Sequence, residues 1–400
     1  MSDILSQGGE PGPRRPWRRW MAVLAALAVV VVVVVEQHPG HRPAPRRPGV
    51  PGSLPAVGGI VGDPAAAPAG PDGITGPTRP WSAQLRLPVG GAQPAWLWPA
   101  TGRTQLIGGL PPDPAGYQFA RAGGGWVITP GPAAGQCGSC AGLPGPVYFL
   151  GDQAGAATRI GQASTAAPAA APRAVWLISY LPGADPGASS ATAQQVSSTG
   201  AAIGPRLRLP AGYLIVRGTA GGLLLAPLRP RANLTADRLW NPAAPRGGRE
   251  FPGVVAAGPG QVAWGQQCTP RCRLQVLNLA TGRTTRVVLP AGSSAAGGTF
   301  SPDGQLLALQ VSSGPGGDGG GQAIRLGVAA AASGRLTLVP GTFVSSDALA
   351  GFGWPGAGHS LVAELSFTTK VQLAAWQPGA ARLAVVAVAP RQRSAALVTG

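Results

Sequence analysis

Groups that carry out catalysis are few in this chain. Its 400 residues include 14 acidic residues, three histidines and four cysteines. Two of the histidines, His38 and His41, lie in a segment rich in Pro, Gly and Ala, so only His359 could serve a Ser-His-Asp triad. Triads, carboxylate pairs and zinc sites each need several such groups to converge. The sequence gives no sign of a converging set, so it favours a non-enzymatic protein and predicts neither a metal nor a cofactor.

Lysine is almost absent, since Lys370 is the only one among 31 basic residues. Arginine in its place, together with abundant Ala, Gly, Pro and Val, is typical of a bacterium with a GC-rich genome. The formal net charge of +17 would suit a nucleic-acid partner. However, the arginines are scattered along the chain and are not interleaved with aromatic residues, as a phosphate-binding surface would require. We therefore expect no nucleic-acid partner.

A single long apolar run, WMAVLAALAVVVVVVV, occupies residues 20–35. As a helix it would be about 24 Å long, and flanking tryptophan and arginine side chains can make up the remaining thickness of a bilayer. We predict a transmembrane signal-anchor helix here, a basic cytoplasmic tail over residues 1–19, and an extracytoplasmic location at the cell membrane for the rest. A cleaved signal peptide is the alternative, although no A-x-A cleavage site follows the run.

The chain changes character twice after this run. Residues 36–80 are mostly Pro, Gly, Ala and Arg, and such a segment cannot bury enough surface to offset its ordering entropy. We predict a disordered linker there. From residue 81 to residue 400, short apolar runs alternate with Gly- and Pro-containing turns, which indicates an all-β domain.

One pattern recurs throughout residues 81–400: an apolar strand, a tight glycine turn, a basic residue and a second strand. It is clear at LQVLNLATGRTTRVVL (274–289) and IRLGVAAAASGRLTLV (324–339). The turn glycines of the seven copies are Gly102, Gly155, Gly200, Gly248, Gly282, Gly334 and Gly379. Their spacing of about 46 residues is close to the period of four-stranded propeller blades. A second hairpin lies between successive copies, as in FSPDGQLLALQV (300–311).

Two hairpins per period predict a β-propeller of about seven four-stranded blades, because one such sheet cannot cover both of its own faces. A strand near Ser82–Leu87 is a candidate for closing the ring with the C-terminal blade. A pair of β-sandwiches is the alternative fold.

The turn formed by Ser301, Pro302, Asp303 and Gly304 resembles the S-P-D-G turn of WD40-like repeats of the TolB type. Pro302 presets φ, Asp303 caps the turn and Gly304 supplies a positive φ. The full match covers one blade, and the Trp-Asp signature of eukaryotic WD40 repeats is missing. The resemblance implies a propeller that acts through protein contacts.

The four cysteines form two local pairs, Cys137 with Cys140 and Cys268 with Cys272. Outside the cytoplasm we expect each pair to form a disulfide bond that stiffens a loop. A four-cysteine zinc site is the alternative, but the two loops fall in blades two and five, too far apart for one ion. A redox-active CxxC is a further alternative, although no helix follows to stabilise a thiolate.

The leading functional hypothesis is a scaffold that binds a protein or an envelope component through a propeller face. One alternative is an extracytoplasmic enzyme or small-ligand sensor that uses the central channel, and another is a purely structural envelope protein without a specific ligand. Outward, separated positions for Asp303, Asp347, Glu364 and His359 would count against an enzyme, and we expect most carboxylates to lie in turns. Core packing accounts for most tryptophans, and a ligand-binding surface is the alternative for Trp96, Trp98, Trp126, Trp176, Trp240, Trp264, Trp354 and Trp376.

Overall fold

A computed structural model describes the chain between residues 86 and 390, apart from short gaps. The gaps are 91–92, 99–100, 114–115, 132–143, 181–190, 228–235, 245–247, 266–271, 314–322, 340–343, 346–348, 357–359, 367–369 and 381–383. The chain divides into two units, Met1–Pro55 and Ala56–Gly400, and every described residue belongs to the second. No helix within the described ranges is long and apolar enough to cross a membrane. The predicted tail, anchor and linker (1–19, 20–35 and 36–80) lie outside them.

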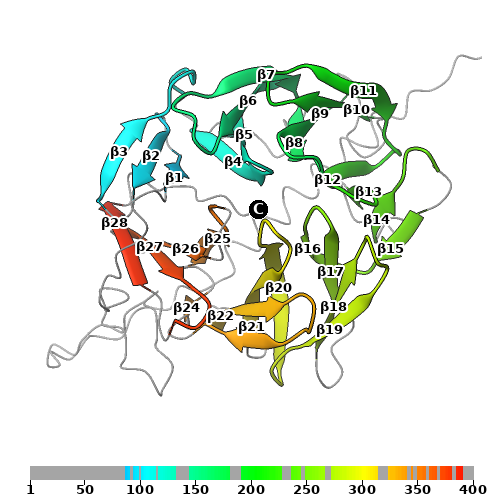
Figure 1. The fold of residues 1–400 in the computed structure, drawn as a ribbon, viewed down its shortest axis with the longest axis vertical. Coiled ribbons are helices and arrows are strands. Elements are labelled where there is room, and N and C mark those ends of the chain that lie inside the picture. The colour runs from blue at the N-terminus through cyan, green and yellow to red at the C-terminus, as the bar shows by residue number, and fades with distance from the viewer. Residues whose placement is uncertain are drawn as a thin grey trace, which may run out of the picture. The chain divides into compact units, whose positions relative to one another are not determined.

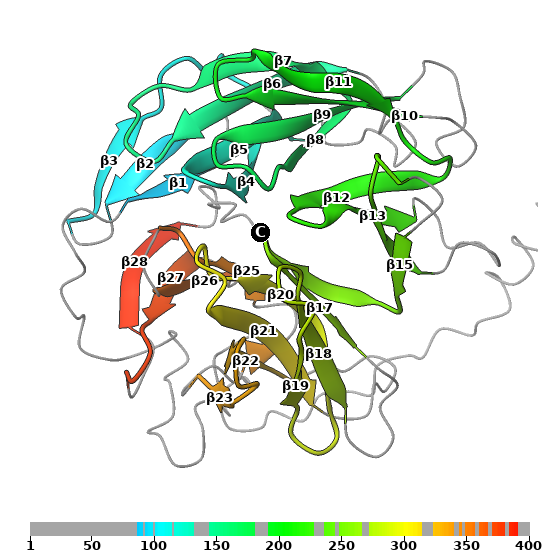
Figure 2. The ribbon, with the colours of Figure 1, turned by 45° about the vertical axis from the view of Figure 1, so that its right-hand side comes forward.

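Seven antiparallel sheets surround a common centre, and this arrangement is that of a seven-bladed β-propeller (Figure 1 and Figure 2). Blade 1 consists of β1 (Leu87–Val89), β2 (Ala95–Trp98) and β3 (Arg103–Leu106), and blade 2 consists of β4 (Tyr117–Ala122), β5 (Gly125–Pro130), β6 (Gly145–Gly151) and β7 (Thr158–Ala163). Blade 3 consists of β8 (Thr165–Pro168), β9 (Ala174–Tyr180), β10 (Ala191–Ser197) and β11 (Ala202–Arg208). Blade 4 consists of β12 (Tyr213–Thr219), β13 (Gly222–Pro227), β14 (Asp237–Trp240) and β15 (Gly248–Phe251). Blade 5 consists of β16 (Val254–Ala257), β17 (Gln261–Gly265), β18 (Arg273–Asn278) and β19 (Thr284–Val288). Blade 6 consists of β20 (Ser293–Phe300), β21 (Leu306–Ser313), β22 (Ala323–Ala330) and β23 (Leu336–Leu338), and β24 (Val344–Ser345) also pairs with β22. Blade 7 consists of β25 (Leu349–Gly353), β26 (Leu361–Ser366), β27 (Lys370–Trp376) and β28 (Ala384–Pro390).

The predicted repeat corresponds to the outer hairpin of each blade. Five of the seven predicted turn glycines adopt a positive φ, among them Gly102 at +66° and Gly282 at +69°. Gly155 lies in the connection between β6 and β7 as predicted, without a positive φ, whereas the prediction is wrong for Gly248, which lies within β15. In blade 4 the chain turns at Asn241 instead, where the Asn241 side chain accepts a hydrogen bond from the amide of Ala243.

The core is divided among the contacts between neighbouring blades. Each of the seven interfaces, including the one between blade 7 and blade 1, has one cluster of buried apolar side chains. Burying one leucine or phenylalanine side chain contributes about 1.5–3 kcal/mol. Stability therefore comes from stacking the sheets around the ring, as the repeat pattern predicted.

Most of the predicted closing strand near Ser82–Leu87 lies outside the described residues, so strand pairing across the ring closure stays a prediction. Its last residue, Leu87, begins β1, which pairs with β2 of its own blade. Among the described residues, contact between blade 1 and blade 7 comes from side chains, because Leu87 packs in one cluster with Val362, Leu373 and Ala375 of blade 7.

The innermost strands of four successive blades share an irregularity. The register with the second strand shifts by one residue within β12, β16, β20 and β25. A β-bulge of this kind bends its strand and redirects the side chains that follow it. The residues directly after the four shifts are Arg217, Ala256, Gly297 and Gly351. A residue with at most a methyl side chain therefore follows three of the bulges, and an arginine that lines the central cavity follows the fourth.

Candidate functional site

A cavity of about 70 Å³ lies at the centre of the propeller. Its wall comes from five blades, because it includes the β4–β5 turn, Arg217 of β12, Pro259, the end of β20 and the segment 353–355 after β25. The larger wall side chains are Trp126, Phe300 and Trp354, so most of the surface is apolar. By volume it has room for a few water molecules or a small organic group.

Arg217 brings an unpaired charge to this wall. Its Nε atom is buried and has no hydrogen-bond partner, and no ion pair to its guanidinium occurs among the described residues. Burial lowers the pKa of Arg217 to about 10. The side chain is still partly exposed to the cavity, so the protein surrounds the charge without satisfying it.

Gly218 allows this strand to approach its neighbour closely. A Cβ atom at Gly218 would lie 2.8 Å from Nε1 of Trp176 and 3.0 Å from Cα of Ala169, both in the blade 3 region. Contacts shorter than about 3.4 Å would displace one of the two blades. The bulge and the following glycine together hold Arg217 in the cavity wall.

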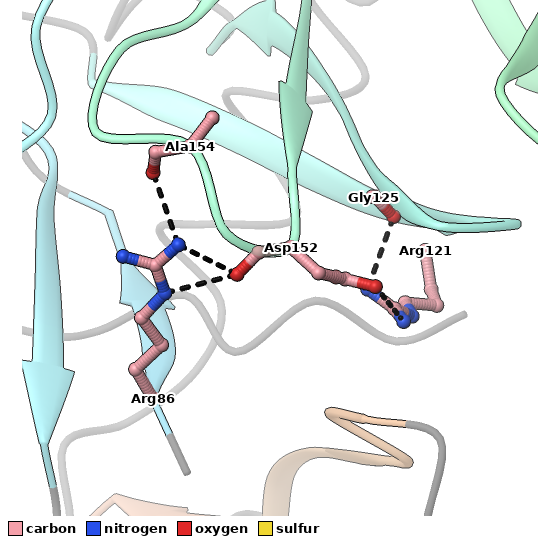
Figure 3. Close-up of polar contacts among 5 residues, drawn as sticks. All are labelled: Arg86, Arg121, Gly125, Asp152 and Ala154. Carbon is pink, nitrogen blue, oxygen red and sulfur yellow. Dashed lines mark hydrogen bonds and ion pairs between the residues drawn. The ribbon is translucent and has the colours of Figure 1, made fainter. Parts of the chain in front are cut away.

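A second arginine at the cavity, Arg121 on β4, is neutralised by a carboxylate (Figure 3). Arg121 forms an ion pair with Asp152, in which its Nη2 lies 2.9 Å from Oδ2, and its Nη1 also donates to the carbonyl of Gly125 at 3.2 Å. The guanidinium lies 5.0 Å from the ring centre of Trp126. Two parallel donors on one carboxylate fix the orientation of Arg121 as well as its charge.

Asp152 is itself held by Arg86, which precedes β1 (Figure 3). Arg86 donates to the main-chain carbonyl of Asp152 at 2.6 and 2.9 Å and to that of Ala154 at 3.2 Å. Its guanidinium lies 4.1 Å from the ring centre of Trp96, whose Nε1 donates to the same Ala154 carbonyl at 2.9 Å. Burial lowers the pKa of Arg86, and the Asp152 charge opposes this. This network joins blades 1 and 2 and uses the Asp152 charge.

The predicted S-P-D-G turn forms as expected. Ser301 donates to Oδ1 of Asp303 at 2.6 Å and accepts the amide of Leu306 at 2.9 Å. Gly304 has φ +70°, and a Cβ there would collide with the side-chain amide of Gln261 in blade 5. The turn therefore serves both local geometry and the contact between blades 5 and 6.

A larger groove of about 550 Å³ lies between blades 5 and 6, next to this turn. Antiparallel strands alternate in direction, so the turns after the first and third strands of every blade share one face of the ring. The groove uses the β18–β19 and β22–β23 turns and the cavity uses the β4–β5 and β20–β21 turns. Both therefore lie on this one face, which we call the turn face.

The structure tests only part of the predicted chemistry. Cys272 is buried directly before β18, at the end of blade 5 away from the turn face, whereas Cys137, Cys140 and Cys268 lie outside the described residues. Both disulfide bonds thus stay predictions. No group of metal-ligating side chains occurs within the described ranges.

Three carboxylates lie in strands and not in turns, namely Asp237, Glu364 and Glu250, which is exposed on β15. Glu364 is buried within β26, and Asp237 is part of β14, where it accepts the amide of Val254 at 2.7 Å. His359 and Asp347 lie outside the described residues. Most of the tryptophans are buried between blades, as predicted, and two of them, Trp126 and Trp354, also line the cavity.

Sequence reasoning did not single out Arg217. A signal was present: RGT at 217–219 of β12 has the same position relative to its bulge as GGT at 297–299 of β20. The charge at an otherwise small position becomes visible once the inner strands are aligned. That alignment needs the bulge, which a strand pattern alone does not locate.

No family model and no curated protein matches this chain. Among solved structures, a protein from Lactobacillus plantarum is 12% identical, with a TM-score of 0.44 over 76% of this chain and 96% of that one. The β-propeller domain of the Trilobed protease from Pyrococcus furiosus is 8% identical, with a TM-score of 0.46 over 74% and 89%. The acylaminoacyl peptidase of Pyrococcus horikoshii is 8% identical, with a TM-score of 0.48 over 74% and 48%, so this chain spans about half of that enzyme.

The sheet topology itself defines the class: this is a seven-bladed β-propeller protein. Resemblances at these identities bear on the fold and not on an activity. Membership of the TolB type remains an expectation based on the S-P-D-G turn.

Proposed function

We propose that this chain is a membrane-anchored binding protein, whose propeller recruits a protein or another envelope component outside the membrane. In this proposal the segment 20–35 is the anchor and the segment 36–80 is a tether. The turn face is the recruiting surface, and the groove between blades 5 and 6 is its centre.

The composition of the groove is the observation that supports this proposal. Exposed Thr281, Arg283 and Gln305 form its rim, and the buried Val276 and partly buried Leu306 lie beneath them. Apolar floors with polar rims are typical of surfaces that bind polypeptides. The rim residues belong to tight turns, so they are presented on a rigid frame and lose little conformational entropy on binding.

Site-specific cross-linking in the native cell tests the proposal. A photoreactive amino acid at Thr281 is expected to cross-link the full-length protein to a defined polypeptide or envelope polymer. The same amino acid at Ala202, exposed on β11 of blade 3, is the matched control. A product at 281 that is absent at 202 and lost on Gln305→Trp, which fills the groove, supports recruitment there. Equal products at both positions would refute the groove as the binding surface.

The location is tested separately from the partner. Protease is added to cells whose outer envelope is opened but whose cell membrane is intact, and it is expected to digest the propeller. Deletion of residues 20–35 is expected to abolish the membrane association of the protein. A propeller protected until the membrane itself is lysed would refute the extracytoplasmic placement.

A further inference from the structure

The cavity at the centre of the ring contains a charge that the fold does not need. After the equivalent bulges of β16, β20 and β25 the chain has Ala256, Gly297 and Gly351, whereas β12 has Arg217. Three blades thus form the same strand geometry with at most a methyl group at this position. The guanidinium of Arg217 is additional to what the blade requires.

The surroundings of Arg217 disfavour its charge. Its Nε atom is buried without a partner, no acidic residue lines the described part of the cavity, and the carboxylate beside the other cavity arginine, Asp152, pairs with Arg121. A buried donor left without an acceptor is destabilising. A charge kept in such a place, and facing a cavity, is suited to an anionic ligand that supplies the missing acceptor.

The charge and size of the cavity define the class of ligand. One unpaired cation balances one negative charge, and a second negative charge would have to be desolvated against an apolar wall. The planar fork of an arginine matches the two oxygens of a carboxylate. The indole rings of Trp126 and Trp354 offer apolar surface beside it, and the volume of about 70 Å³ admits only a small molecule.

We propose that the central cavity binds the carboxylate of a small monocarboxylic acid on Arg217, with the hydrocarbon part of the acid against Trp126 and Trp354. The site is separate from the groove between blades 5 and 6 and does not depend on a recruited partner.

Propionate is the probe, added to the purified full-length protein in detergent at constant ionic strength. Saturation-transfer NMR and isothermal titration are expected to show binding of propionate, but not of its neutral amide or of inorganic phosphate. Arg217→Ala, which reproduces the residue of blade 5, is expected to weaken binding at least about tenfold. Arg206→Ala removes an exposed arginine on β11 and is expected to leave binding unchanged.

Several results would overturn the proposal. Absence of a propionate signal in the wild-type protein would do so without any variant, as would phosphate binding as tightly as propionate. Equal affinity in Arg217→Ala would show that the acid binds elsewhere. Should that variant fail to fold, Arg217→Met preserves the side-chain stem, and undiminished propionate binding by it would be equally decisive. The cross-linking at Thr281 is independent of all these outcomes.

Discussion

Replacing Arg217 by methionine is expected to stabilise the unliganded protein. The methionine keeps an unbranched apolar stem against the cavity wall and removes the desolvated charge. Burial lowers the pKa of Arg217 well below its ordinary value, to about 10, which is a shift of between two and three pH units. At about 1.36 kcal/mol per unit this corresponds to about 3 kcal/mol.

The partial exposure of Arg217 to the cavity reduces this figure, because solvent screens the charge, and we expect a gain of about 1–2 kcal/mol. At about 2 °C per kcal/mol for a domain of this size, Tm should rise by about 2–4 °C. The measurement is thermal unfolding of the full-length wild-type and Arg217→Met proteins in the same detergent, without carboxylate buffers.

The pH dependence provides an internal check. The folded pKa of Arg217 lies below its unfolded value, so the penalty is complete below about pH 10 and decreases as the pH rises further towards the unfolded pKa. The advantage of the variant should therefore be constant between pH 7 and 9 and become smaller above pH 10. A variant less stable than wild type throughout pH 7–9 would refute the reasoning, since it would mean that the charge of Arg217 stabilises the fold.

The remaining predictions concern single positions described above. Asp237→Asn is expected to stabilise the protein at pH 7, because burial raises the pKa of Asp237 above 3.8 and the asparagine oxygen can still accept the backbone amide of Val254. The gain in stability should vanish in unfolding experiments below about pH 3.8, where Asp237 is protonated in both the folded and the unfolded state. A loss of stability at pH 7 would contradict this prediction. Gly334→Ala should destabilise the protein by more than about 3 kcal/mol in a denaturant titration, since φ is +71° and the new Cβ would collide with the carbonyl of Arg286 in blade 5. Gly282 has a similar φ of +69° but nothing within 4 Å of the position of a Cβ, so Gly282→Ala should cost only about 1 kcal/mol in the same titration. Similar losses for the two glycines would show that blade contact does not matter at 334. Asp152→Asn should lower stability by about 1–2 kcal/mol by leaving Arg121 without its ion pair, and most of this loss should disappear in an Arg121→Met background, as a double-mutant cycle would measure.

The hairpins could be predicted from the sequence because their determinants are local. Alternating apolar residues and a glycine with positive φ, as at Gly282 and Gly334, specify a tight turn without help from the rest of the chain. Gly248 misled the same reasoning, because a glycine is also tolerated within a strand, and here the side chain of Arg238 occupies the space beside it.

The candidate site could not be predicted in the same way. The surroundings of Arg217 come from five blades, so neither its burial nor its lack of a partner is encoded near residue 217 in the sequence. The seven blades follow from the period of the repeat, whereas closure by Leu87 depends on where the last blade meets the first.

The packing at the seam between blade 7 and blade 1 has a mechanical consequence. Among the described residues, the cluster between blade 7 and blade 1 contains four buried residues, against twelve between blades 6 and 7, and the described strands of blades 7 and 1 share no hydrogen bonds. The first described strand, β1, belongs to blade 1 and lies at this seam. A pulling force on the N-terminal side would therefore act in the peeling direction on blade 1, where few contacts resist it, and the ring would open there while the other six interfaces stayed intact.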